Sequence, residues 1–294
     1  MASGRTAEQA AAETDAALKA RTEGRQTATR PRRPRLHAQA LSLEAPMRPG
    51  ERLRIEAAGP VVVMPAFDEN VQVRAEAAAM TRERASSARA VLTEAEGGAR
   101  TLRIEFASPS ETGDFSSFEV ALPRGVAVEI RTGRAPVTVN DAAAPVTIAS
   151  ESGEITVFNI EGSVTATTSN GGIQMTGVSG PVVARTANAP IVLESVAGSV
   201  EAVTSNASVS VRLDDGSAGP VRIETSNAAV MLALSRALRG SLSASSDGGV
   251  VVMTPGAPTT GAEEAFRTFR RSFGEGPEST VTTSGGAITL IGPF

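Results

Sequence analysis

Two adjacent carboxylates, Asp214 and Asp215, come nearest to a catalytic or metal-binding pair in the repetitive part of this chain. Paired carboxylates can act as acid and base on a glycosidic bond, and carboxylate oxygens are also ligands that calcium prefers. Gly216 follows them, however, and Asp and Gly together are typical of a solvated turn. The calcium-binding repeat Gly-Gly-x-Gly-x-Asp is absent. We therefore interpret the pair as part of a turn.

The residue inventory excludes several other chemistries. The 294 residues include no Cys, Trp or Tyr and a single histidine, His37. Thiol nucleophiles, disulfides, Cys/His zinc sites and multi-histidine metal centres are therefore excluded. The nine aromatic side chains are all Phe, which leaves little for stacking sugars or nucleic-acid bases. We expect no catalytic residue, no cofactor, no metal ion and no nucleic-acid partner.

A repeat of 18 to 21 residues dominates the second half of the chain. Its coils begin at Val128, Val146, Val164, Val182, Val200, Val221, Leu242 and Ser279. Within each coil, the positions at offsets 0, 2, 9 and 11 from this start are apolar in 31 of 32 cases, and Ser279 is the exception. Two short strands with alternating side chains would point all of these positions inward.

One such coil is too small to bury its own apolar side chains, so successive coils must stack. Stacking at a strand spacing of about 4.8 Å would pair equivalent strands in parallel. The predicted fold class is all-β, a flattened parallel β-solenoid of the β-helix or β-roll type. Right-handed coiling is the default for parallel crossovers. Val146, Val164, Val182 and Val200 should form one inward column.

The turns between strands also repeat. Thr or Ser stands at offset 4 of every coil, and Asn stands at offset 6 of four successive coils. Asn tolerates left-handed backbone angles, so this turn is expected to need one. Side-chain hydrogen bonds along the stack would make these residues a structural ladder. The predicted ladder residues are Asn170, Asn188, Asn206, Asn227, Thr168, Thr186, Thr204 and Thr225.

Composition divides the chain into three parts. Residues 1–40 contain few large apolar side chains and the run Arg30–Arg35, which predicts a disordered basic tail. Residues 41–125 alternate like strands and form an N-terminal β region of the solenoid domain. Residues 126–294 carry the repeats, interrupted by an insertion at 255–278. No apolar stretch reaches the length of a signal-peptide core or a membrane span.

The insertion has the end signals of a short helix over residues 262–274, with acidic residues first, arginines last and a glycine stop. Three phenylalanines and three arginines would line that helix: Phe266, Phe269, Phe273, Arg267, Arg270 and Arg271. One interpretation is a cap that covers an open side or end of the solenoid. The other is a helix that docks on a membrane surface or in a protein groove.

The recurrent corner Thr-Ser-Asn-Gly-Gly-Ile or Thr-Ser-Asn-Ala-x-Val, at 167–173, 204–209 and 225–230, gives the chain a family resemblance. With the phrase Val-Ala-Leu-Pro-Arg-Gly at 120–125, it resembles the bacterial DUF4097 family of adhesin-like, or toastrack, β-solenoid domains. Ala207 and Ala228 stand where that family usually has Gly. The resemblance implies a non-enzymatic scaffold of the cell envelope and supplies no catalytic residues.

Three functions therefore stay open. The first is a structural or interaction module of the bacterial cell envelope with an unidentified envelope partner, weak membrane-surface contact at most, and a monomeric or weakly self-associating state. The second is a self-assembling solenoid filament of the bactofilin type. The third is a polysaccharide-acting enzyme, although carboxylates do not converge along the outward strand positions.

Overall fold

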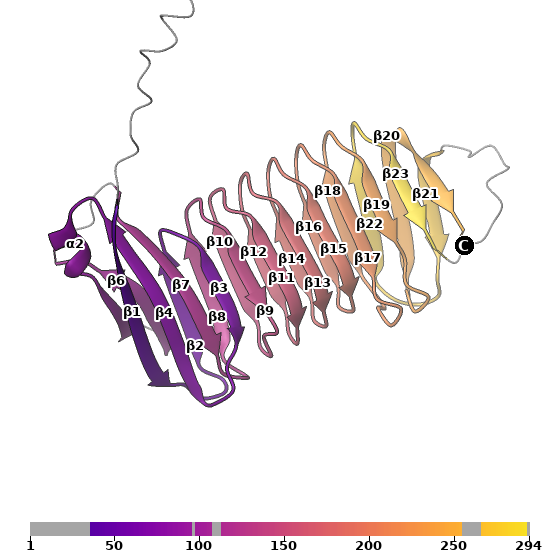
Figure 1. Ribbon diagram of the computed structural model, residues 1–294. Coiled ribbons are helices and arrows are strands. Elements are labelled where there is room, and N and C mark those ends of the chain that lie inside the picture. The colour runs from indigo at the N-terminus through magenta and orange to yellow at the C-terminus, as the bar shows by residue number, and fades with distance from the viewer. Residues whose placement is uncertain (1–35, 96–97, 108–112, 255–265, 293–294) are drawn as a thin grey trace, which may run out of the picture. The chain divides into compact units, whose positions relative to one another are not determined.

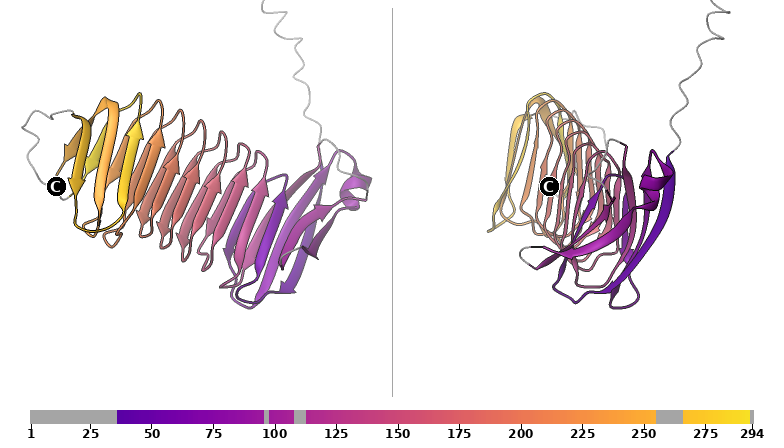
Figure 2. Two further views of the ribbon diagram at one scale, coloured as in Figure 1. Left: turned by 180° about the vertical axis from the view of Figure 1, so that it is seen from behind. Right: turned by 90° about the vertical axis from the view of Figure 1, so that its left-hand side faces the viewer.

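The computed structural model describes residues 36–95, 98–107, 113–254 and 266–292. The predicted tail lies outside these ranges up to residue 35, and residues 37–40 belong to the first strand, β1 (His37–Pro46). From His37 onward the chain is one compact unit, and it is built almost entirely from strands (Figure 1). Successive coils lie side by side along it (Figure 2).

The strands of the stacked coils form two sheets, called S1 and S2. In stacking order, S1 contains β6 (Ala99–Glu105), β2 (Arg52–Ala57), β8 (Ala127–Thr132), β10 (Val146–Ser150), β12 (Val164–Thr167), β14 (Val182–Arg185), β16 (Val200–Val203), β18 (Val221–Thr225), β22 (Glu278–Thr283) and the first half of β20 (Ser241–Met253). S2 contains β7 (Phe115–Leu122), β3 (Val61–Pro65), β9 (Val137–Asn140), β11 (Ile155–Ile160), β13 (Ile173–Val178), β15 (Ile191–Val196), β17 (Val209–Leu213), β19 (Val230–Ala233), β23 (Ile288–Ile291) and the end of β20.

These stacked strands pair in parallel, so the predicted parallel solenoid with two main strands per coil is confirmed. The column of Val146, Val164, Val182 and Val200 pairs residue by residue, and each of the four is buried. Inward-facing Val, Ile, Leu, Ala and Met side chains from both sheets form one continuous core. Each coil thus buries its apolar positions against its neighbours, as the period-two pattern predicts.

Antiparallel strands cover ends of this stack. At the N-terminal end, β4 (Asn70–Ala79) pairs with β7 and β1 pairs with β4, while β5 (Arg89–Glu94) pairs with β6. The short helix α2 (Arg82–Ser86) lies between β4 and β5 in the chain. At the C-terminal end, β21 (Phe266–Ser272) pairs with β20. A further parallel coil added to these edges would meet an antiparallel strand.

The stacking order departs from the chain order at both ends. The coil of β2 and β3 lies between the coil of β6 and β7 and the coil of β8 and β9. The last coil, β22 and β23, lies between the coil of β18 and β19 and strand β20. The predicted parallel stacking therefore extends to Leu290, but the coil that begins at Leu242 lies outside the coil that begins at Ser279, although it comes first in the chain.

Ser279 shows how the last coil fits inside the stack. In the regular coils, the backbone N–H at offset 0 donates to a backbone carbonyl of the next coil, as Val200 does to Pro220. The N–H of Val221 instead donates to Oγ of Ser279, at 3.1 Å. Ser279, the polar residue at an inward offset, is 1% exposed. Its buried hydroxyl is satisfied by this hydrogen bond.

The inward positions of β20 are also shifted by one residue. Val250 and Val252 pair with the inward Ile288 and Leu290, so the expected inward positions, Val251 and Met253, face outward instead. The turn before them is one residue shorter than in the neighbouring coil, and Gly249 within it has a φ of 94°. A shift of one residue exchanges the two faces of a strand.

The helix predicted for 262–274 is wrong over residues 266–272, which form strand β21; residues 255–265 lie outside the described ranges. The signals for helix ends in the local sequence are outweighed by the pairing of this segment with β20. An edge strand leaves a row of backbone N–H and C=O groups without partners. Residues 268–272 of β21 supply those partners along residues 241–245 of β20.

Candidate functional site

Four asparagines form a hydrogen-bonded column at the turn between the two strands of successive coils. The Nδ2 of Asn188 donates to Oδ1 of Asn170, that of Asn206 to Asn188, and that of Asn227 to Asn206, each at 2.8 Å. Asn170 in turn donates to Oγ of Ser152 at 3.2 Å. The four asparagines are exposed. The column therefore links five coils by hydrogen bonds outside the core.

The left-handed backbone predicted at this turn is wrong. Among the described residues other than glycine, positive φ values occur at Asp141, Asn159 and Ser195, between 53° and 55°. With Gly177, at 71°, they recur every 18 residues at the outer end of the S2 strands. Asp, Asn, Ser and Gly are all turn-forming residues. Their recurrence at one offset is visible in the sequence, although residue type alone did not predict the left-handed backbone there.

Replacing Asn206 is expected to cost about 1 kcal/mol of unfolding free energy, because it removes two exposed side-chain hydrogen bonds. Since the backbone is not left-handed here, Asn206→Ala should be at least as stable as Asn206→Gly, which adds chain entropy to the unfolded state. Denaturant unfolding of both variants measures this. A clearly more stable glycine variant would contradict this account of the turn.

The hydroxyl column lies just inside the asparagine column and is buried. Each of the four predicted threonines is at most 6% exposed. Their Oγ1 atoms donate to backbone carbonyls of the adjacent coil, Thr168 to Gly153, Thr186 to Gly171, Thr204 to Ala189 and Thr225 to Ala207, at 3.0 to 3.4 Å. These contacts satisfy hydroxyls that would otherwise be buried without a partner.

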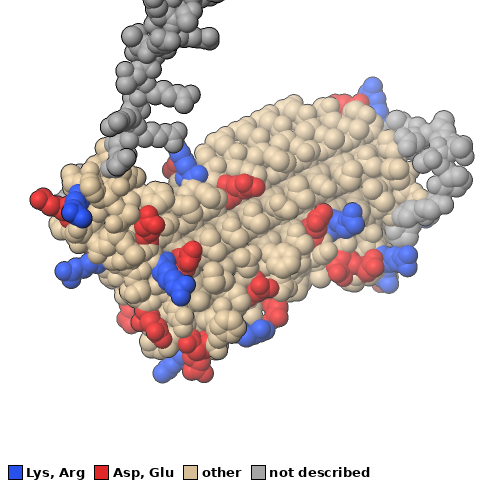
Figure 3. Space-filling view, in the orientation of Figure 1, with Lys and Arg blue, Asp and Glu red and all other residues tan. Residues whose placement is uncertain are grey.

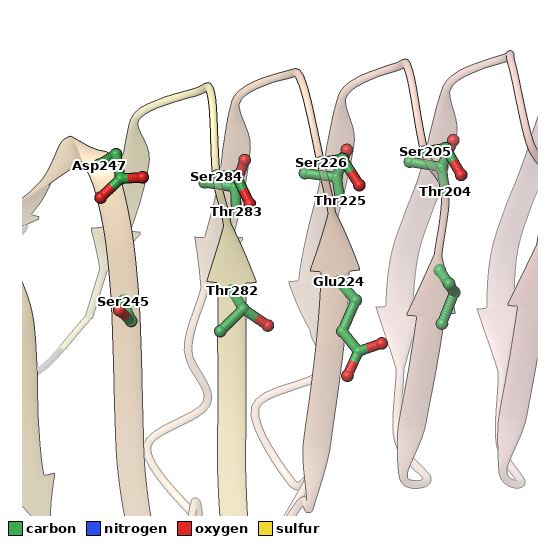
Figure 4. Close-up of a pocket in the computed structure, with 11 residues that line it drawn as sticks. Thr204, Ser205, Glu224, Thr225, Ser226, Ser245, Asp247, Thr282, Thr283 and Ser284 are labelled. Atoms are coloured by element: carbon green, nitrogen blue, oxygen red, sulfur yellow. The ribbon is translucent and has the colours of Figure 1, made fainter.

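An open hollow of about 440 Å³ lies on S1 near the C-terminal end of the stack. Hydroxyl side chains from four stacked strands and their turns line most of it, with the carboxylates of Glu224 and Asp247 (Figure 4). Strand β22 lies between the strands that carry these two carboxylates. Glu224 accepts hydrogen bonds from Arg222, at 2.7 and 3.1 Å. The hollow offers hydrogen-bonding groups to a polar ligand, with one of its carboxylates already in an ion pair.

The Asp214–Asp215 pair lies in a turn, as interpreted from the sequence. Oδ1 of Asp214 accepts the backbone N–H of Gly216 at 3.0 Å, and the carbonyl of Asp215 accepts the hydroxyl of Ser235 at 2.8 Å. Within the described ranges, no group of three or more His, Cys, Asp or Glu side chains is arranged to hold a metal ion. The side chain of Asp214 therefore stabilises the turn by a local hydrogen bond.

The residues of the predicted capping or docking helix lie on and beside β21. Phe269 and Phe273 are partly buried against the core, whereas Arg267 and Arg270 are exposed. The guanidinium of Arg271 lies 6.0 Å from the ring centroid of Phe273. Phe266 pairs with Val250 through the backbone. Strand β21 therefore covers residues 241–245 of β20, at the edge of S1.

Glu129 is the centre of an ion-pair cluster on the outer surface of S1. Its carboxylate lies 3.0 Å from Nη2 of Arg54 and 2.9 Å from Nη2 of Arg131. Burial, the largest single effect, raises the pKa of Glu129, but the hydrogen bonds and charges of the two arginines together hold it below its usual value. The cluster therefore joins the coils of β2 and β8 with an ionised carboxylate.

No protein-family model and no curated protein matches the chain, so the resemblance to the DUF4097 family is not confirmed. Among solved structures, the chain is similar to "a putative adhesin" from Bacteroides fragilis, with 7% identity, a TM-score of 0.42, and coverage of 87% of this chain and 97% of that one. It is also similar to "a putative cell adhesion protein" from Clostridium sporogenes, with 10% identity, a TM-score of 0.23, and coverage of 87% and 100%. Across the described residues, no helix is long and apolar enough to cross a membrane.

Proposed function

We propose that this chain is a non-enzymatic β-solenoid scaffold of the bacterial cell envelope that presents its sheet surfaces for interaction. The observation that carries the proposal is the continuous core, in which each coil packs on both neighbours through in-register parallel strands. Such a stack holds its outward side chains at fixed spacings over a long surface. The envelope location is supported by the sequence resemblance to the DUF4097 family.

The covered ends favour a discrete scaffold over a bactofilin-like filament. A filament that continues the solenoid needs free parallel edges at both ends of the stack. In S1 the stack ends in antiparallel β5 and β21, and at the N-terminal end of S2 it ends in antiparallel β4 and β1. At these three edges a second molecule therefore meets strands that do not continue the repeat.

Light scattering on the full chain tests this distinction. Over a concentration range of about 1 to 200 µM, the mass should stay at one or two copies, because a closed assembly does not grow. A mass that increases steadily with concentration would indicate a filament and contradict the scaffold proposal.

The envelope location needs its own test. Full-length protein expressed with a small tag in a bacterial host should collect in the envelope fraction. If the protein is recovered only in the fraction that contains ribosomes and soluble proteins, the proposed envelope location is contradicted. The proposed scaffold architecture is unaffected by that result.

A further inference from the structure

The outer surfaces of S1 and S2 differ sharply in charge. The outward residues of S1 include the ion pairs Arg54–Glu129, Arg131–Glu129, Arg185–Glu201 and Arg222–Glu224. Along S2, from β3 to β20, the outward residues of nine strands include only two charged ones, Glu194 and Arg212. A broad uncharged area along the middle coils is visible in Figure 3. The two outer surfaces of one regular solenoid therefore differ in the partners that they can bind.

The uncharged side also carries exposed apolar side chains. Met64, Phe158, Met231 and Met253 are between 37% and 51% exposed, and all four lie at outward positions of S2 strands. The strands of S1 carry no large hydrophobic side chain of comparable exposure among the described residues. Exposed apolar side chains on a face with few charges are typical of an interaction surface.

Glu194 and Arg212 occupy the same outward position on adjacent strands, β15 and β17. Both are exposed, and neither has an ion-pair partner among the residues that the structure describes. Four S2 strands from β3 to β13 precede them in the stack and three, β19, β23 and β20, follow. An unpaired acid and base thus lie side by side near the middle of the surface.

We propose that the outer surface of S2 binds a second copy of this chain, face to face, about a two-fold axis that runs parallel to the strands between β15 and β17. A two-fold interface brings residue i against residue j and j against i. This axis exchanges β15 and β17, so Glu194 of each copy faces Arg212 of the other. Glu194 and Arg212 each meet the opposite charge of the other copy only if the axis lies between β15 and β17.

The same axis also places uncharged outward residues opposite each other elsewhere on the surface. It exchanges β11 with β23, so that the exposed Phe158 of one copy meets Ile291 of the other, two outward residues at equivalent offsets. It also exchanges β13 with β19, which places Gln174 against Met231. Phe158, the exposed aromatic side chain of these strands, therefore meets an apolar partner rather than a charge.

The area available is sufficient for a specific dimer. The axis matches the eight strands from β9 to β20. At about 4.8 Å spacing, with about five residues of about 3.3 Å each, they cover about 600 Å² per copy. The total of about 1,200 Å² is at the lower limit for a stable specific interface. We therefore expect a reversible dimer of moderate affinity, which adds a partner to the proposed scaffold and does not depend on its envelope location.

Sedimentation velocity on the full chain and three variants tests the dimer. The unmodified chain should form a dimer within the range of about 1 to 200 µM. Arg212→Glu places like charges opposite each other and should raise the dimer dissociation constant at least about tenfold. The double variant Glu194→Arg, Arg212→Glu restores the opposite charges and should restore dimerisation.

Thr167→Glu serves as the matched control, because it adds a negative charge at an exposed outward position of S1. It should leave the dissociation constant unchanged. A chain that stays monomeric over the whole range would overturn the proposal and point to a different protein as the partner of S2. Equal effects of Arg212→Glu and Thr167→Glu, or a double variant as weak as Arg212→Glu, would also overturn it. Growth beyond two copies would instead contradict the scaffold proposal.

Discussion

The Ile173→Ala variant is expected to lose about 3 to 4 kcal/mol of unfolding free energy. Ile173 is 1% exposed and pairs in register with Ile155 on one side and Ile191 on the other, so its side chain is enclosed by the neighbouring coils. Truncation to Ala removes buried methyl groups and leaves a cavity that the rigid stack cannot easily collapse. Chemical denaturation of the full chain measures the loss.

Gln174 provides the control within the same strand. It follows Ile173 directly, points to the opposite side of S2 and is exposed. Gln174→Ala should change the unfolding free energy by no more than about 0.5 kcal/mol, as is usual for surface substitutions. Comparable losses for the two variants would mean that the side chains of this strand do not alternate between core and solvent.

The Gly198→Ala variant is expected to lose about 2 to 3 kcal/mol, for a different physical reason. A Cβ atom at Gly198 would lie 2.2 Å from the carbonyl oxygen and 2.3 Å from the carbonyl carbon of Gly180, in the neighbouring coil. These are backbone atoms, so the clash can be relieved only by moving one coil away from the other. That movement would weaken the interstrand hydrogen bonds on either side of the turn.

Gly172→Ala is the matched control for this variant. The nearest atom to a Cβ at Gly172 is the carbonyl oxygen of Pro190, at 3.8 Å, which is an ordinary contact. This variant should be as stable as the unmodified chain, or slightly more stable, because alanine reduces the entropy of the unfolded state. Equal thermal melting of the Gly198→Ala and Gly172→Ala proteins would refute the close approach of the coils at Gly198.

The inward positions that Ile173 represents were predictable from the sequence because their pattern is local. Alternation within each strand decides which side chains face the core, and the repeat length decides which residues come into register. Val146, Val164, Val182 and Val200 pair as the spacing predicts. The asparagine column could be anticipated in the same way, because stacked coils bring identical offsets together.

The backbone conformation of the turns was not predictable from residue type alone. Asn favours left-handed angles, but the tertiary stack places those angles at Asp141, Asn159, Gly177 and Ser195, at the ends of the S2 strands. Likewise, residues 262–274 have the end signals of a helix, but residues 266–272 form β21. The unpaired edge of β20 offers a row of hydrogen bonds that an exposed short helix lacks.

The sequence by itself therefore determined the coil: its two strands, its inward side chains and its parallel pairing with equivalent strands. Only the tertiary structure decided which coil lies beside which at the ends of the stack. Most coils present the same apolar offsets and the same backbone edge, so most coils could pair in register with one another, and the local pattern does not encode their order. What distinguishes one coil from another at the end of the stack is a non-local contact, such as the hydrogen bond from the N–H of Val221 to the hydroxyl of Ser279.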